Sequence, residues 1–125
     1  MTKRVLIIDD EPAIRMIVEI AIKAIAGWGV LLAASGQEGI AVAEAEQPDA
    51  ILVDLMMPGM DGITTVQKIQ ANAALLSIPI ILFTAKSQIG EQEQFASVRI
   101  AGVIMKPFKA AELVQEIRSL LNWHE

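Results

Sequence analysis

The chain of 125 residues contains no cysteine, which excludes disulfide scaffolds, thiolate zinc sites and cysteine nucleophiles. It also lacks basic charge: ten Lys and Arg against fifteen Asp and Glu give a net charge of −5, so we expect no nucleic-acid binding by this chain alone. The most apolar stretch, residues 73–83, is far shorter than the ~20 residues of a membrane span. The N-terminal residues do not match a signal peptide. We therefore expect a cytoplasmic protein with no membrane partner.

The apolar residues that are present, 54% of the chain against 20% charged, are enough for one core, so we expect a single domain over residues 1–125. Five short apolar runs rich in Val and Ile are typical of strands buried on both faces, as in a parallel sheet. These runs are Val5–Ile8, Val30–Ala33, Ala50–Val53, Ile78–Phe83 and Gly102–Met105.

Segments with helical spacing alternate with these runs. We predict helices over residues 37–46, 63–71 and 110–121, a weakly anchored one over residues 87–97, and a first helix that begins at an Asp10 N-cap and ends at Gly27. The first helix has an apolar stripe that we expect to face the core: Ile14, Ile17, Val18, Ala21, Ile22 and Ile25. Arg15, Glu19 and Lys23 are predicted to point outward, and Met16 and Met105 to fill the core. The alternation predicts an α/β fold whose sheet is covered on both faces.

Polar side chains follow four of the five predicted strands. Asp9 and Asp10 come after the first, Asp54 after the third, Thr84 after the fourth and Lys106 after the fifth. Ligands of open parallel sheets bind beyond the carboxyl ends of the strands. Three clustered carboxylates are electrostatically costly unless a cation lies among them. This distribution therefore predicts a site.

The three carboxylates and Lys106 sum to a charge of −2, which would attract a divalent cation that prefers oxygen ligands, such as Mg²⁺. These residue types fit a carboxylate nucleophile, Asp54, that accepts a phosphoryl group. The metal and the ammonium of Lys106 would stabilise the phosphoryl oxygens, and Thr84 would donate a hydrogen bond to them.

Four motifs, in order and at fitting spacings, resemble the receiver domain of two-component response regulators, of the stand-alone, chemotaxis-regulator-like kind. They are Val5–Pro12 (VLIIDDEP), Ile51–Gly62 (ILVDLMMPGMDG), Phe83–Ala85 (FTA) and Lys106–Phe108 (KPF). The resemblance spans the whole chain. It implies a flavodoxin-like (βα)5 fold, a doubly wound parallel sheet with strand order 2-1-3-4-5.

Carried over residue by residue, the resemblance implies that Asp54 is the phosphoacceptor. It implies Mg²⁺ ligation by Asp10, Asp54 and the backbone carbonyl of Met56, with Asp9 binding directly or through water. Thr84, the backbone of Ala85 and Lys106 would contact the phosphoryl group. A cis peptide bond between Lys106 and Pro107 is also implied.

The chain departs from the family pattern at the switch position, where Val103 replaces the usual Tyr or Phe. Val103 is too short to sweep the volume of an aromatic ring, so we expect the response to leave through the helix over residues 87–97. An output partner would then bind across residues 87–121. Met56 and Lys86 hold the positions that tune acyl-phosphate lifetime in the family, and Met56 cannot activate water.

The leading interpretation is a signalling protein, not an enzyme, that receives its phosphoryl group from a histidine kinase or phosphotransfer protein. One alternative is a phosphohydrolase of the haloacid dehalogenase type, which needs a second Asp where Met56 stands. The other is a binding module that keeps the fold without phosphorylation. The chain could also be a receiver taken from a longer protein.

Overall fold

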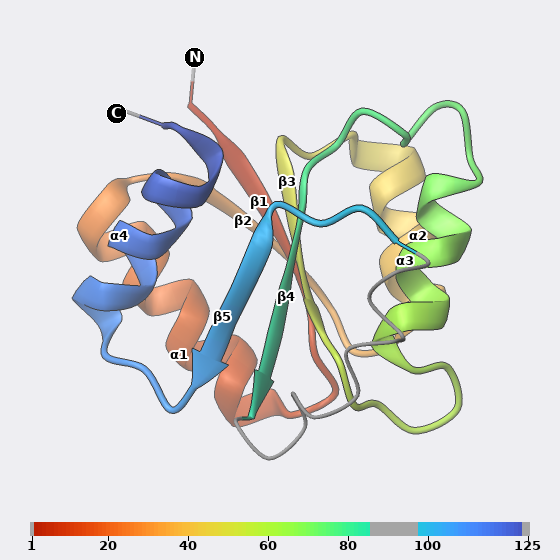
Figure 1. The fold of residues 1–125 in the computed structure, drawn as a ribbon. Coiled ribbons are helices and arrows are strands. Elements are labelled where there is room, and N and C mark those ends of the chain that lie inside the picture. Colours follow the sequence, from red (N-terminus) through yellow and green to blue (C-terminus); the bar gives the residue numbers. More distant parts are fainter. Residues whose placement is uncertain (1, 86–97, 124–125) are drawn as a thin grey trace.

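The computed structural model describes residues 2–85 and 98–123 and contains one parallel five-stranded sheet. The strand order is β2-β1-β3-β4-β5, which confirms the predicted order. Helices α1 and α4 cover one face of the sheet, and α2 and α3 cover the other (Figure 1). The predicted helix over residues 87–97 lies outside the described residues, as do residues 1, 124 and 125.

The sheet and its helices have the following bounds. The strands are β1 (Arg4–Ile8), β2 (Gly29–Ala33), β3 (Ala50–Asp54), β4 (Ile80–Ala85) and β5 (Gly102–Lys106). The helices are α1 (Pro12–Ala21), the π-helical η1 (Ile22–Ala26), α2 (Gly36–Glu46), α3 (Gly62–Gln70) and α4 (Ala110–Leu121).

The central strands are buried on both faces, as their unbroken apolar runs predict. Side chains of alternate residues therefore enter two separate cores. Leu6, Ile8 and Val53 pack under α2 and α3, whereas Val5 and Ile7 pack under α1 and α4. Within the described residues, no helix is long and apolar enough to cross a membrane.

The first helix differs from its prediction in three respects. It begins at Pro12 with Glu11 as N-cap, not Asp10, and its last five residues form the π-helical η1 before Gly27 ends it at φ +73°. Only part of its apolar stripe is covered: Val18, Ala21 and Ile22 are buried, whereas Ile17 is 49% exposed. The predictions that Met16 and Met105 fill the core are wrong, since both are exposed. Only the face of a helix that packs against its neighbours is buried, so side chains at the margin of a broad apolar stripe stay exposed.

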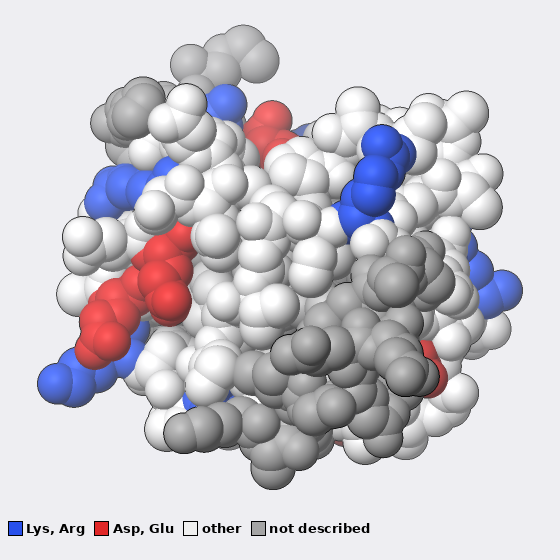
Figure 2. All heavy atoms as spheres, viewed as in Figure 1, with Lys and Arg blue, Asp and Glu red and all other residues white. Residues whose placement is uncertain are grey.

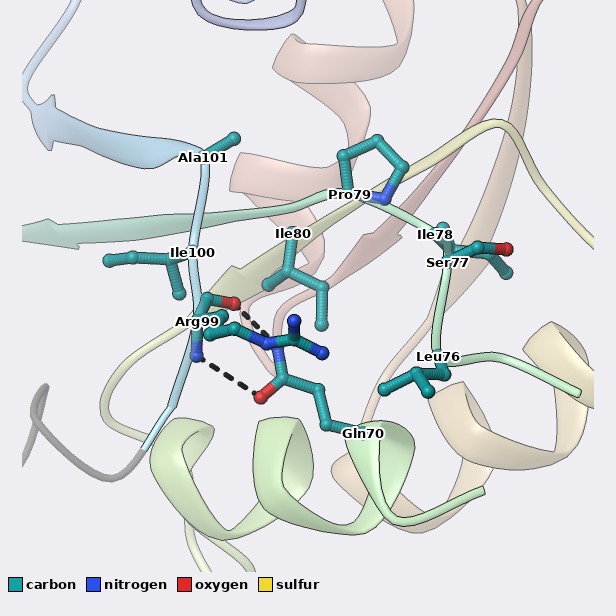
Figure 3. Close-up of a pocket in the computed structure, with 9 residues that line it drawn as sticks. All are labelled: Gln70, Leu76, Ser77, Ile78, Pro79, Ile80, Arg99, Ile100 and Ala101. Carbon is teal, nitrogen blue, oxygen red and sulfur yellow. Dashed lines mark hydrogen bonds between the residues drawn. The ribbon is translucent and has the colours of Figure 1, made fainter. Parts of the chain in front are cut away.

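Two hydrogen bonds between Gln70 and the backbone of Arg99, here called the Gln70 clasp, link the end of α3 to the chain that leads into β5. The amide of Gln70 accepts a hydrogen bond from the Arg99 N–H at 3.1 Å and donates one to the Arg99 carbonyl. Both residues lie beside a hollow of about 380 Å³ near the amino-terminal end of β4, with Ile80 among its lining residues (Figure 3). This end of β4 is opposite the end that carries Thr84. The Gln70 clasp therefore lies away from the predicted site.

Helix α3 begins directly against the carboxyl end of β3. Asp61 caps the helix, accepting a hydrogen bond from the Thr64 N–H at 2.8 Å. The Gly62 N–H donates to the Leu55 carbonyl at 2.9 Å. A Cβ at Gly62 would lie 2.3 Å from the Asp54 carbonyl oxygen and 2.7 Å from the Leu55 Cα. The contact is with backbone on both counts, so no side-chain rotation can relieve it.

Gly62→Ala is expected to lower the free energy of unfolding by roughly 1–3 kcal/mol, because the added methyl group overpacks the backbone after Asp54. Urea denaturation measures the change. Lys68→Ala, on the exposed side of the same helix, is the matched control and should change stability by less than about 0.5 kcal/mol. Equal stability of the two variants would contradict the close approach.

Candidate functional site

The sheet register brings the polar residues predicted at the strand ends to one edge. Ile8 pairs with Val53, so Asp9 and Asp54 follow neighbouring positions of β1 and β3. Asp54 in turn pairs with Phe83, the residue before Thr84. Ala85 pairs with Lys106 across the last two strands. Five predicted site residues therefore gather at the carboxyl end of the sheet: Asp9, Asp10, Asp54, Thr84 and Lys106.

Three carboxylates converge at this edge. Carboxylate oxygens of Asp9, Asp10 and Asp54 all lie within 4.8 Å of one another. Asp9 is fully buried, and Asp54 is 4% exposed. Like charges this close repel one another strongly where water is largely excluded. The cluster therefore needs compensating cations or hydrogen-bond donors.

Lys106 is the ammonium that reaches this cluster. Its Nζ lies 3.0 Å from Asp9 Oδ2 and 3.5 Å from Asp54 Oδ1. The same Nζ lies 4.8 Å from the ring centroid of Phe83, a cation–π distance that favours one position of the long side chain. The predicted cis peptide bond between Lys106 and Pro107 is present. One positive charge against three negative charges leaves the cluster at −2, as the sequence predicted.

The three carboxylates differ in how far the protein already satisfies them. Asp9 Oδ1 accepts a hydrogen bond from the Glu11 N–H at 2.9 Å, and its Oδ2 faces Lys106. Asp54 Oδ1 accepts from the Met56 N–H at 3.3 Å. Among the described residues, no group donates to the Asp10 carboxylate, which is half-buried. Asp10 therefore keeps its acceptor capacity for a ligand.

Burial, and after it the negative charge of Asp9, raises the pKa of Asp54 from 3.8 to about 6. Lys106 and the Met56 N–H act in the opposite direction but do not cancel the effect. A carboxyl group whose pKa is raised in this way is poorly ionised in mildly acidic solution. A cation bound beside it would restore ionisation and hence its capacity to act as a nucleophile.

The remaining predicted residues take varied positions. Thr84 is fully buried at the end of β4, and its hydroxyl lies 3.4 Å from the Ala85 carbonyl oxygen. The Met56 side chain is exposed, so only its backbone reaches inward. Val103 is half-buried and packs against the core under α2 and α3. Lys86 lies outside the described residues.

The structure adds a residue that the helical pattern assigned to the outer surface. Arg15 is half-buried, and its Nη1 donates a hydrogen bond to the Asp9 carbonyl oxygen at 2.7 Å. The pattern missed it because periodicity separates core from surface but does not locate the end of the helix that borders the site. Glu19 and Lys23 do point outward as predicted and form an ion pair at 2.8 Å.

The donor set fits a hard divalent cation. Carboxylate oxygens and a backbone carbonyl are the ligands that Mg²⁺ prefers, and Mg²⁺ usually retains several waters in such sites. Among the described residues, Asp9, Asp10 and Asp54 form the group of acidic side chains close enough to share an ion. The unsatisfied carboxylate of Asp10 and the net charge of −2 support the same conclusion.

A parallel sheet in this order, with an acidic cluster, a Lys and a buried Thr at the ends of its strands, defines a doubly wound α/β domain whose site lies at the carboxyl edge of the sheet. The family model of the response regulator receiver domain matches residues 5–118, and the chain belongs to this family of two-component signalling. A relative is the DNA-binding dual master transcriptional regulator RpaA of Synechocystis sp., 38% identical over 119 residues, which are 95% of this chain and 49% of that protein. The chain spans about half the length of such relatives.

Solved structures of receivers match over nearly the whole chain. Chemotaxis protein CheY4 of Vibrio cholerae has a TM-score of 0.89 at 28% identity, covering 96% of this chain and 99% of that one. The receiver domain of sensor histidine kinase PA1611 from Pseudomonas aeruginosa has a TM-score of 0.86 at 29% identity, covering 98% and 99%. That structure is described with a magnesium ion coordinated in its active-site cleft. The flavodoxin-like fold is thereby confirmed.

The raised pKa of Asp54 predicts how the stability of the metal-free protein depends on pH. The folded chain binds the Asp54 carboxyl proton more tightly than the unfolded chain does. The stability that this proton contributes is therefore complete below pH 3.8 and is lost as the pH rises through about 6. Asp54→Asn removes the titration while keeping the shape. The stability of wild type relative to Asp54→Asn should therefore fall by roughly 1–3 kcal/mol between about pH 4 and pH 7.

Urea denaturation of both proteins across this range, with a chelator present, measures the difference. A difference that stays constant with pH would contradict the perturbed carboxyl group.

Proposed function

We propose that the chain is a phosphoacceptor signalling domain whose Asp54 takes a phosphoryl group in a Mg²⁺-dependent reaction. The observation that supports this most strongly is the position of Asp54, buried beside Asp9 and Asp10 and 3.5 Å from the Lys106 ammonium. Membership of the receiver family supports the same role. The protein would act in the cytoplasm by changing its affinity for a partner, without sustained catalytic turnover.

In the proposed step, a carboxylate oxygen of Asp54 attacks the phosphorus of a phosphohistidine or of a small acyl phosphate. A new O–P bond forms, and the bond from phosphorus to the leaving group breaks. The leaving group keeps that electron pair: a histidine imidazole takes a proton from solvent, whereas the carboxylate of an acyl phosphate leaves as the anion. Lys106 and the Thr84 hydroxyl would bind the phosphoryl oxygens of the product, Lys106 turning from the Asp54 carboxylate to its phosphoryl group.

Asp10, Asp54 and the Met56 carbonyl, with Asp9 directly or through water, would hold the Mg²⁺ ion. The ion supplies positive charge that offsets the charge developing on the phosphoryl oxygens. Asp9 would also orient Lys106, to which it is bonded at 3.0 Å. The exposed Met56 side chain cannot activate water, which favours a long-lived acyl phosphate.

The phosphohydrolase alternative finds less support at the same site. Turnover of that type needs an acid/base carboxyl group two residues after the nucleophile, and the thioether of Met56 points outward there. A module that never becomes phosphorylated would have no need of three clustered carboxylates and a half-buried Lys partner. Both alternatives predict no stable adduct on Asp54.

The partner that delivers the phosphoryl group is proposed to be a sensor histidine kinase or a phosphotransfer protein. Three apolar side chains on α1, here called the α1 patch, are 57%, 49% and 60% exposed: Met16, Ile17 and Ile20. The patch lies on the helix that begins directly after Asp9–Glu11, next to the acceptor. Exposed apolar patches of this kind mark protein interfaces. The kinase or phosphotransfer partner would therefore contact the α1 patch while it reaches Asp54.

Output is proposed to occur across residues 87–121, on an effector that the chain does not identify. No role in nucleic-acid binding is proposed for these residues. The face in Figure 2 carries acidic side chains over α4 and Lys or Arg side chains that lie singly, so its drawn and coloured atoms form no continuous basic stripe. The relative RpaA is named as a DNA-binding regulator, but this chain matches only 49% of that protein's length.

Incubation with acetyl phosphate and Mg²⁺ is expected to add a single phosphoryl group, visible by intact mass, that is stable in acid and labile in base. Asp54→Asn should abolish the adduct, because an amide is no comparable nucleophile. Excess chelator should do the same. A full adduct on the variant would place the acceptor elsewhere, and equal labelling in chelator would remove the metal from the mechanism.

Ile20→Glu is expected to slow phosphotransfer from a cognate kinase or phosphotransfer protein at least about tenfold while leaving labelling by acetyl phosphate unchanged. A charge in the α1 patch opposes apolar contact but does not touch the acceptor. Leu76→Glu, at the opposite end of the sheet and also exposed, is the matched control and should leave both rates unchanged. An unchanged rate of transfer to Ile20→Glu would contradict docking on the α1 patch.

A further inference from the structure

Arg15 ties the first acidic turn to the helix that follows it. Its Nη1 donates to the Asp9 carbonyl oxygen at 2.7 Å, and its backbone N–H donates to the Glu11 carbonyl at 3.1 Å. A single residue of α1 thus binds two of the three residues that lead out of β1. A hydrogen bond from a guanidinium is short and about twice as strong as one between neutral groups.

Among the described residues, no side chain caps the N-terminus of α1, and its N-cap N–H is bonded only to the Asp9 carboxylate. Its N-cap, Glu11, makes no capping hydrogen bond, and no acidic side chain occurs in its first turn. By comparison, Ser35 caps α2 and Asp61 caps α3, each through a bond to a backbone N–H. The bond from Arg15 to Asp9 satisfies no free N–H of α1, but it ties the first turn of the helix to the end of β1.

The anchored segment contains the carboxylate of the cluster that accepts no hydrogen bond from the described residues. Asp9 on one side is held by Ala33, Glu11 and Arg15, its N–H donating to the Ala33 carbonyl at 3.1 Å. Asp10 lies between the two residues that Arg15 binds, and within residues 2–85 and 98–123 its carboxylate accepts no hydrogen bond. Within the described part of the chain, the position of the Asp10 carboxylate therefore depends on the backbone of Asp9 and Glu11 and not on a hydrogen bond of its own.

We propose that Arg15 is a positioning residue for the cation site, holding the Asp9–Glu11 backbone so that the Asp10 carboxylate lies beside Asp54. This inference rests on the proposed Mg²⁺ dependence. Groups that orient metal ligands contribute substantially to affinity, and their loss typically costs 10–100-fold. Arg15 contacts neither the cation nor the phosphoryl group in this role; it acts through the carbonyl of Asp9.

Positioning and simple charge predict opposite results. Arg15 is a cation close to a site for a second cation, so charge alone would make Arg15→Ala bind Mg²⁺ more tightly. Loss of a positioning bond makes the variant bind more weakly. Arg15→Lys separates the two further, because it keeps the charge and one donor but not the reach or the planar geometry of the guanidinium.

The test measures the Mg²⁺ dissociation constant of the unphosphorylated protein by calorimetric or NMR titration. Arg15→Ala is expected to weaken binding about tenfold, and Arg15→Lys by less. Lys23→Ala is the matched control, since it removes a cation from the same continuous helical segment without touching the site, and it should leave binding unchanged. At saturating Mg²⁺ the rate of labelling by acetyl phosphate should return to near the wild-type rate in both Arg15 variants.

Mg²⁺ binding that is unchanged or tighter in Arg15→Ala would overturn the inference. A labelling rate that stays low at saturating Mg²⁺ would also overturn it, because Arg15 would then act on the phosphoryl group directly. If wild type itself binds no Mg²⁺, the proposed function fails first. Urea denaturation checks that each variant folds, and Arg15→Gln replaces Arg15→Ala should the latter not fold.

Discussion

The arrangement of this domain depends on one electrostatic constraint: three carboxylates are held together at the end of a buried sheet with a single ammonium among them. Sheet register alone puts Asp9, Asp54 and Lys106 at neighbouring strand ends, and the packing of two cores keeps those strands in register. The packing and hydrogen bonding of the sheet therefore hold the three carboxylates together against their mutual repulsion. One consequence is the raised pKa of Asp54, and another is a site whose net charge of −2, when its carboxyl groups are ionised, would be offset by a divalent cation.

Within that constraint the carboxylates have different surroundings, and these differences suggest different roles. Each carboxylate oxygen of Asp9 accepts a hydrogen bond, one from a backbone N–H and one from Lys106, which suits a role in orienting Lys106. Asp54 is buried and only partly compensated, which suits a group that reacts and gains charge. Asp10 has no donor within the described part of the chain, which suits a ligand for a cation. Identical side chains thus acquire distinct chemistry from their neighbours alone.

Much of this could be predicted from the sequence, because unbroken apolar runs specify buried parallel strands and polar residues directly after them must meet at one edge. Asp54, Thr84 and Lys106 were found in this way. Features that depend on which side chains the tertiary packing buries could not be predicted from the sequence. The α1 patch shares Ile17 with the predicted core stripe, and only the packing of α1 against the sheet and α4 decides which of its apolar residues are covered. Arg15 was missed because a long side chain on a helical face can reach back to the preceding loop.

The same geometry bears on how a phosphoryl group could be sensed without an aromatic switch residue. Val103 packs in the core opposite Leu82 and has few rotamers, so it offers little room for movement. Thr84 and Lys106, by contrast, stand at the ends of two strands that are hydrogen-bonded to each other, with Ala85 paired to Lys106. A group that draws both side chains inward acts on β4 and β5 together. The paired backbone of β4 and β5 would then transmit the change at Asp54 in place of a rotating aromatic ring.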